Sequence, residues 1–229
     1  AHLSKDFTLI KIDLPGHGKS KVYQEIHTVE LMAEKVKEVI DALKLEKINL
    51  LGHSLGGYVS LAFAEKFPEI LESMTLFFST TVADDEEKKA IRRRSIAVID
   101  ENFETFVKTS IPNLFSNNEK DILEGKIELA KNIAKSTNKE GVKAAQLGMA
   151  ERPDRTEILE NLDAKILIIA GKYDNAVKTE NLLKIIPEKT NIKTYVLDCG
   201  HNGHWEKPTI CAEIINTELL HNLPKHFLL

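Results

Sequence analysis

The chain lacks the features that mark several classes of protein. Its two cysteines, Cys199 and Cys211, are too few among 229 residues for a disulfide framework. With 31 basic and 35 acidic side chains it has no positive excess of the kind that nucleic-acid-binding surfaces carry. No apolar run reaches the length of about 18 residues that a membrane-spanning helix needs. We therefore expect neither a nucleic-acid nor a membrane partner. The few cysteines and the lack of a recognisable signal peptide predict a cytoplasmic protein.

The remaining composition and the order of hydrophobic patterns predict an α/β fold. Hydrophobic residues make up 42% and charged residues 29% of the chain, as in a globular domain with a buried core. Strand-like runs at 7–13, 48–51 and 74–79 alternate with helical patterns at 28–44 and 56–67. This β-α-β-α-β order predicts a mostly parallel sheet flanked by helices. After residue 162 the alternation resumes, with strands expected at 165–171 and 191–198 and helices at 179–186 and 209–220.

A charged, purely helical stretch interrupts this alternation. No strand-like run occurs between residues 82 and 162, where four helical patterns follow one another: 84–100, 103–110, 118–136 and 139–150. The sequence thus predicts a core made of residues 1–81 and 163–229, with a helical insertion at 82–162. The acidic-then-basic run 84–94 is typical of a solvated helix with acids near its N-terminus. The alternative interpretation is an anion-binding or nucleic-acid-binding patch at arginines 92–94.

One motif points to nucleophilic catalysis. Residues 52–56 read Gly-His-Ser-Leu-Gly, a G-x-S-x-G pattern between a predicted strand and a predicted helix. A nucleophile elbow needs such a strand-to-helix turn, and its glycines leave room for the tight backbone around a strained serine. Ser54 is then the candidate nucleophile, and the backbone N–H of Leu55 is a candidate oxyanion donor.

A serine hydroxyl needs a base within hydrogen-bond reach, and that base needs a carboxylate to orient it. Asp174 follows the predicted strand at 165–171, and His201 follows the predicted strand at 191–198. Both would lie at the carboxyl ends of parallel strands, the edge of the sheet at which the elbow is expected. The order serine, acid, histidine is that of the α/β-hydrolases.

The chain resembles the α/β-hydrolase fold superfamily of small esterases and lactonases. The stretches that carry the resemblance span nearly the whole chain: 13–20, 52–57, 148–154, 170–174 and 200–208. The resemblance implies that Ser54 is the nucleophile, Asp174 the acid and His201 the base. It also implies that the insertion at 82–162 is a helical cap over the substrate pocket. The cap side chains that we expect to shape an apolar pocket, or to form the core of the cap, are Phe103, Phe106, Phe115 and Met149.

His204 competes with His201 for the role of base. In the family pattern the histidine directly after the glycine is catalytic, which favours His201. A metal site formed by Cys199, His201 and His204 is disfavoured, because no further carboxylate or histidine is placed to complete a hydrolytic zinc site. We therefore expect no metal and no cofactor.

Serine at the elbow favours acyl-enzyme chemistry. Haloalkane dehalogenases and epoxide hydrolases of the superfamily have aspartate there. The leading hypothesis is a serine hydrolase that cleaves a small carboxylic ester or lactone. Carbon–carbon bond hydrolysis, perhydrolysis and a lyase role fit the same triad, and a non-catalytic ligand-binding homologue is a further alternative. The oligomeric state is left open.

One part of the family pattern is absent from the sequence. The second oxyanion-hole donor comes from a loop, often containing His-Gly, that follows another central strand. No such segment is found, and its strand would lie between the strands at 7–13 and 48–51, leaving backbone groups unpaired. We expect that about 20 to 40 residues or more, the size of a βα unit, are missing from the chain as given.

Overall fold

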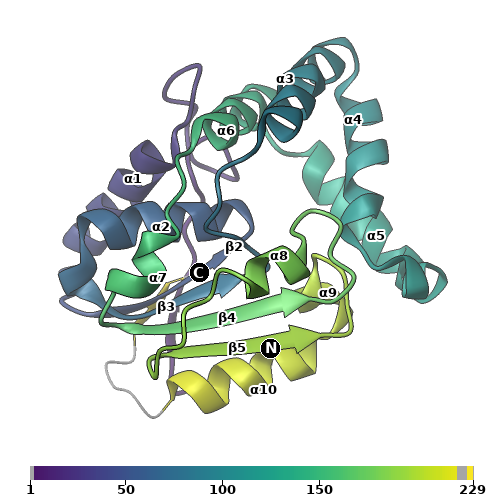
Figure 1. The fold of residues 1–229 in the computed structure, drawn as a ribbon. Coiled ribbons are helices and arrows are strands. Elements are labelled where there is room, and N and C mark those ends of the chain that lie inside the picture. Colours follow the sequence, from purple (N-terminus) through teal and green to yellow (C-terminus); the bar gives the residue numbers. More distant parts are fainter. Residues whose placement is uncertain (1–2, 221–225, 229) are drawn as a thin grey trace.

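The computed structural model describes residues 3–220 and 226–228. A sheet of six strands forms its centre, in the order β1-β6-β2-β3-β4-β5, with every recorded pair parallel. Figure 1 shows helices on both faces of this sheet, so the predicted parallel α/β architecture is confirmed. The strands are β1 (Thr8–Ile10), β2 (Ile48–His53), β3 (Leu71–Phe77), β4 (Lys165–Gly171), β5 (Ile192–Leu197) and β6 (His226–Leu228).

Eight of the helices follow the predicted patterns with shifts at their ends, whereas the short helices at 157–161 and 203–206 were not predicted. The α-helices are α1 (Val29–Ala42), α2 (Leu55–Lys66), α3 (Glu86–Glu101), α4 (Phe103–Ser110), α5 (Lys120–Lys135), α6 (Lys139–Glu151), α7 (Glu157–Asn161), α8 (Thr179–Leu183), α9 (Gly203–Glu206) and α10 (Pro208–Leu219). Short 3-10 turns are η1 (Pro68–Ile70), η2 (Ile111–Leu114) and η3 (Asn117–Glu119).

Both faces of the sheet are buried, because helices cover each of them. Successive side chains of a strand point to opposite faces and so enter two different apolar clusters. In β2, Leu50 joins the apolar cluster formed with α1 and α2, whereas the adjacent Leu51 joins the cluster on the side of α10. Helix α2 lies between the sheet and α1, and its eight residues from Gly57 to Ala64 are all buried. This two-sided burial keeps the carboxyl ends of β2 and β4, which flank β3, at the same edge of the sheet.

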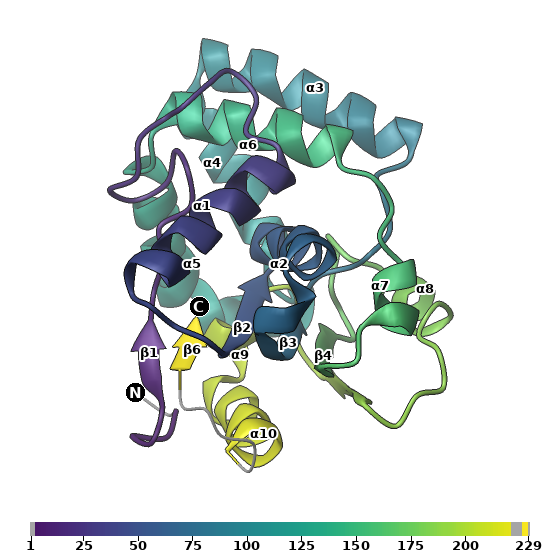
Figure 2. The ribbon, with the colours of Figure 1, turned by 90° about the vertical axis from the view of Figure 1, so that its left-hand side faces the viewer.

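The first strand and its neighbour differ from the expectation. A strand was predicted over residues 7–13, but β1 covers only Thr8–Ile10. The position between β1 and β2, expected to be empty, holds β6, which pairs with β1 along its length and with Asn49 and Leu50 of β2 (Figure 2). The expectation of an unpaired central strand is therefore wrong where β2 pairs with β6, at Asn49 and Leu50. The absence of a βα unit from the chain stays a prediction.

Five α-helices, α3 to α7, lie between β3 and β4 in the sequence, within the stretch 82–162 that we call the cap segment. Figure 1 shows α3, α4, α5 and α6 grouped on the side of the sheet opposite α10. The two ends of the segment are joined, because the backbone N–H of Arg155 donates to the carbonyl of Thr81 at 3.0 Å. The division of the chain into a core and a cap remains a prediction.

The run 84–94 is not uniformly solvated. Arg93 and Arg94 are exposed, as expected for a solvated helix, but Asp84 is buried. Lys88 and Arg92 are only partly exposed, because α3 turns them toward the interior of the molecule. The expectation of a solvated helix is wrong for this side of α3.

Within the described ranges, no helix is both long enough and apolar enough to cross a lipid bilayer.

Candidate active site

Ser54 stands at the sharp turn between β2 and α2. Its backbone has φ 52° and ψ −111°, a left-handed conformation that is strained for any residue other than glycine. The turn is held by the N–H of Ser54, which donates to the carbonyl of Phe77 on β3 at 3.0 Å. Strain of this kind persists only where the surrounding structure enforces it, and it is the backbone signature expected of a nucleophile elbow.

Gly52 in the motif and Gly57 just after it must lack a side chain, because neighbouring atoms approach both of them closely. A Cβ on Gly52 would lie 2.1 Å from the carbonyl oxygen of Gly56, and a Cβ on Gly57 would lie 2.3 Å from Oγ of Ser79. Any side chain at these positions would push α2 away from the strands. The predicted reason for the glycine pattern thus holds at Gly52 and at Gly57, just after the five-residue motif, but not at Gly56, where a Cβ would meet open space.

The structure brings the three predicted site residues into one hydrogen-bonded chain. His201 Nε2 lies 2.7 Å from Ser54 Oγ, and His201 Nδ1 lies 2.7 Å from Asp174 Oδ2. Because a carboxylate accepts, Nδ1 carries the proton and Nε2 accepts from the serine hydroxyl. This is the tautomer that a general base needs.

Asp174 is fixed by the turn after β4. Its Oδ1 accepts from the N–H groups of Ala176 at 2.7 Å and Val177 at 2.8 Å, which leaves Oδ2 for His201. The carboxylate and the imidazole are both almost completely buried, with side-chain exposures of 1% and 2%. Burial removes competing water, so the hydrogen bond between them holds the imidazole in one orientation.

A buried glutamate, which the sequence analysis did not single out, supports the histidine loop. Glu206 Oε2 accepts from the N–H of Gly200 at 2.9 Å and from the N–H of Ser116 at 3.1 Å. The N–H of His201 donates to the carbonyl of Leu114 at 3.0 Å. The loop that carries His201 is therefore tied to the cap segment. Glu206 lies within the stretch 200–208 that carried the family resemblance, but its role depends on contacts that the sequence does not show.

His204, the other candidate base, makes no hydrogen bond to Ser54 in the structure. The centroid of its ring lies 4.8 Å from that of His53, the residue before Ser54, and the ring that pairs with Ser54 Oγ is that of His201. Within residues 3–220 and 226–228, no three histidine, cysteine or carboxylate side chains are arranged to hold a metal ion.

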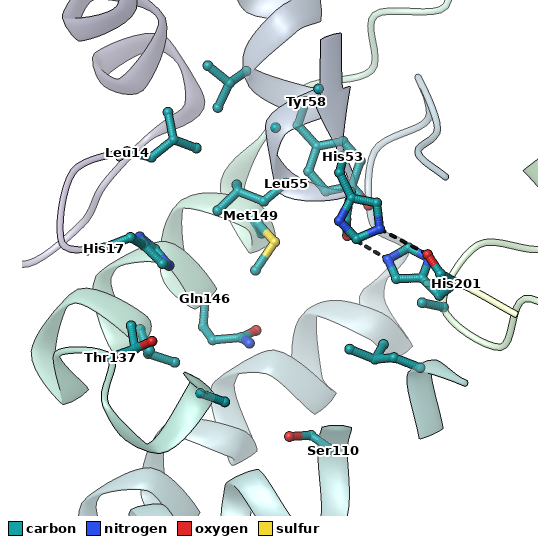
Figure 3. Close-up of a pocket in the computed structure, with 18 of the residues that line it drawn as sticks. Leu14, His17, His53, Leu55, Tyr58, Ser110, Thr137, Gln146, Met149 and His201 are labelled. Carbon is teal, nitrogen blue, oxygen red and sulfur yellow. Dashed lines mark hydrogen bonds between the residues drawn. The ribbon is translucent and has the colours of Figure 1, made fainter. Parts of the chain in front are cut away.

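A cavity of about 870 Å³ adjoins Ser54 and His201 and is bounded by the core and by the cap segment. Leu55, the predicted oxyanion donor, lines it at the start of α2, and Figure 3 shows His53 and His201 side by side at one end. Phe103, Phe106 and Met149 also line it. Phe115 does not, because it is fully buried in a separate cluster with Leu123 and Ile127. Of the two alternatives expected for these side chains, Phe115 follows the second, because it packs in a buried cluster of the cap segment.

Residues 1–208 match the family described as alpha/beta hydrolase fold. The chain belongs to this family, and it is an α/β-hydrolase enzyme. A thermophilic esterase from Thermogutta terrifontis, solved with malate bound, is 32% identical, with a TM-score of 0.83 over 91% of this chain and 78% of that one.

Two curated relatives match with lower identity. A putative 2-succinyl-6-hydroxy-2,4-cyclohexadiene-1-carboxylate synthase of Bacillus subtilis (strain 168) is 28% identical over 92% of this chain and 80% of its own length. A 2-hydroxy-6-oxononadienedioate/2-hydroxy-6-oxononatrienedioate hydrolase of Escherichia coli (strain K12) is 27% identical over 87% of this chain and 72% of its own length.

Proposed function

We propose that the chain is a serine hydrolase that cleaves a small carboxylic ester or lactone through an acyl-enzyme intermediate. The observation that carries this proposal is the unbroken chain of hydrogen bonds from Ser54 through His201 to Asp174 at the edge of a cavity. The similarity to a structure described as an esterase supports the same chemistry.

In the first half of the reaction, Ser54 Oγ attacks the carbonyl carbon and its proton passes to His201 Nε2. Asp174 stabilises the imidazolium that forms, and the N–H of Leu55 stabilises the oxyanion. The tetrahedral intermediate collapses, and the leaving alkoxide takes the proton from His201. In a lactone this alkoxide remains attached to the acyl group.

In the second half, water attacks the acyl-enzyme. His201 accepts the proton of the water, and Ser54 leaves as the alcohol after taking that proton back. The same residues therefore serve both steps.

A fluorophosphonate probe tests the nucleophile directly, because it forms a covalent bond with an activated serine. We expect labelling of the wild-type protein and none of the Ser54→Ala variant. Ser95→Ala is the matched control, since Ser95 also lines the cavity but lies outside the triad. Absence of labelling in the wild type would favour a non-catalytic ligand-binding protein. A series of 4-nitrophenyl esters of increasing acyl length would then measure the substrate range.

A carbon–carbon bond hydrolase is the second candidate, favoured by the similarity to a relative whose name is that of a hydrolase of hydroxy-oxo-dienedioates. A perhydrolase or lyase would use the same triad. A carbon–carbon hydrolase would bleach the dienol chromophore of that class of diacid. Hydrolysis of the esters with no bleaching supports the ester and lactone proposal.

A further inference from the structure

A cluster of cations surrounds one buried carboxylate on the cap side of the cavity. Asp84, whose side chain is completely buried, accepts from Arg152 Nη2 at 2.9 Å and from Arg92 Nε, and its Oδ1 lies 3.8 Å from Lys88 Nζ. Among the described residues, the recorded ion pairs of all three cations go to Asp84. Three cations thus share one paired carboxylate, and the charge of Asp174 acts on Lys88 from the side of the triad.

The first of the three cations, Arg152, is buried and uses its hydrogen-bond donors on neighbouring groups of the protein. The side chain of Arg152 is only 3% exposed. Its guanidinium lies 3.8 Å from the ring centroid of Tyr58 and donates to the carbonyls of Met149 and Val82. Arg152 thus holds the end of the cap segment against α2.

The other two cations border the cavity itself. Lys88 and Arg92 both line it, one helical turn apart on α3. Arg92 Nη1 donates to Gln146 at 3.1 Å, and Figure 3 shows Gln146 on the cavity wall. The side chain of Lys88 is 37% exposed and is part of the cavity lining.

The ammonium of Lys88 also lies near the reacting groups. Its Nζ donates to the carbonyl of Ala176 at 2.9 Å, and the N–H of Ala176 donates to Asp174. Burial lowers the pKa of Lys88, and the charges of Arg92 and Arg152 add to this against the opposing charge of Asp84. A further anion beside Lys88 would stabilise its charged form.

The carboxylate of Asp13 also lines the cavity, and it is hydrogen-bonded within its own loop. Asp13 Oδ2 accepts from the N–H of Lys19 at 2.9 Å, and the Cα of Gly18 packs so closely that a Cβ there would lie 2.3 Å from the carboxyl group. The charge offered to a ligand on the wall formed by α3 is thus positive, beside a lining that is otherwise largely apolar.

We propose that Lys88 and Arg92 bind a carboxylate group of the substrate while Ser54 attacks its ester or lactone carbonyl. This inference rests on the proposed function and names the substrate class, an anionic ester or lactone. In a partly desolvated cavity, an ion pair with two cations discriminates against an uncharged substrate of the same shape.

Two matched pairs of esters test the charge preference and the side on which the charge lies. In the first pair, mono-4-nitrophenyl glutarate carries a carboxylate on its acyl group and is compared with the uncharged 4-nitrophenyl hexanoate. In the second pair, 4-acetoxybenzoate carries a carboxylate on its alcohol group and is compared with the uncharged 4-acetoxybenzamide. Spontaneous hydrolysis is subtracted in each case. We expect kcat/KM to be at least about tenfold higher for the anionic member of one pair, and salt to reduce this preference.

The Lys88→Met variant should lower the ratio of kcat/KM for the anionic ester to kcat/KM for the uncharged ester about tenfold, mainly by raising KM for the anionic ester. Lys88→Arg should retain most of this ratio. Lys89→Met is the control, because Lys89 lies on the same helix and pairs with Glu86. The melting temperature of each variant reports whether it is folded. A preference for the uncharged ester in both pairs, or an equal loss on both members in Lys88→Met, would overturn the inference.

A binding measurement separates this inference from the proposed function. Calorimetric titration of the Ser54→Ala variant with the anionic ester of the pair that shows the preference needs no catalysis, and we expect binding that the added Lys88→Met substitution weakens about tenfold. Failure of the wild type to hydrolyse any ester would contradict the proposed function alone. Equal affinity of the two variants would contradict the anion site alone.

Discussion

His53 Nε2 lies 2.9 Å from the backbone carbonyl oxygen of His201. A carbonyl only accepts, so Nε2 carries the proton and His53 donates across the gap between the elbow and the histidine loop. Burial and the neighbouring His201 and His204 lower the pKa of His53 well below its ordinary value, which keeps the ring neutral. We expect His53 thereby to position His201, the proposed base.

Loss of this donor should slow the reaction without weakening substrate binding. We expect His53→Ala to lower kcat about tenfold with little change in KM, because the loop that carries His201 loses a buried hydrogen bond. His53→Gln, whose side-chain amide can donate to the same carbonyl, should restore most of the rate. Steady-state kinetics on a 4-nitrophenyl ester would measure both variants. An equally inactive His53→Gln protein would argue against a positioning role.

Asp174→Asn should leave the loop folded but disable the base. The amide oxygen can go on accepting from Ala176 and Val177, while its NH₂ group faces Nδ1 of His201 and favours the wrong tautomer. We expect kcat to fall by about 10³-fold to 10⁴-fold with an unchanged melting temperature. A modest fall of a fewfold would mean that Asp174 does not orient the base.

Asp84 should make the protein sensitive to acid. Burial opposes ionisation, but the hydrogen bonds and charges of Arg152 and Arg92 hold the pKa of Asp84 below its ordinary value. Its stabilising contribution is therefore complete above the ordinary carboxyl pKa of about 3.9 and is lost as the pH falls through the lower folded-state value.

The test is the free energy of unfolding of the wild type and of Asp84→Asn as a function of pH. We expect the variant to be about 3–5 kcal/mol less stable at neutral pH, because the buried Arg152 and the partly buried Arg92 lose their partner, and to lose less stability in acid. Asp41→Asn is the control, since Asp41 pairs with Lys37 on the exposed side of α1. Parallel acid curves for wild type and Asp84→Asn would contradict the assignment.

Two cap phenylalanines should respond differently to truncation. Phe115 is completely buried beside Leu123 and Ile127, so Phe115→Ala should cost about 3–5 kcal/mol of stability and leave the acyl-length preference unchanged. Phe103 lines the cavity, so Phe103→Ala should shift the preference toward longer acyl chains at a smaller cost in stability. Thermal unfolding together with an ester series distinguishes the two. The reverse pattern would mean that the cavity is bounded differently.

Much of the site could be predicted because its signals are local. The strand-turn-helix pattern around Ser54, and the positions of Asp174 and His201 after strands, follow from hydrophobic periodicity and from the rule that parallel strands end at one edge. These residues lie within hydrogen-bonding distance in the structure. Their catalytic roles remain proposals.

Other features were missed because they depend on contacts between distant segments. The phenylalanine pattern of the cap could not separate Phe103 on the cavity wall from Phe115 in the cap core. The charged run 84–94 indicated a solvated helix, yet Asp84 is buried by Arg152, which lies 68 residues away. A strand pattern also does not say which strands will be its neighbours. In the structure β6 lies between β1 and β2, a position that we expected to be empty.

By itself the sequence determined the alternation of strands and helices, the elbow and the order of serine, acid and histidine, since these depend on spacing along the chain. Only the tertiary structure decided that His53 holds His201, that Glu206 ties the histidine loop to the cap segment, and that Lys88 and Arg92 border the cavity. The reason is physical: a side chain acquires a partner, a degree of burial and an electrostatic environment only when residues far apart in the sequence pack together.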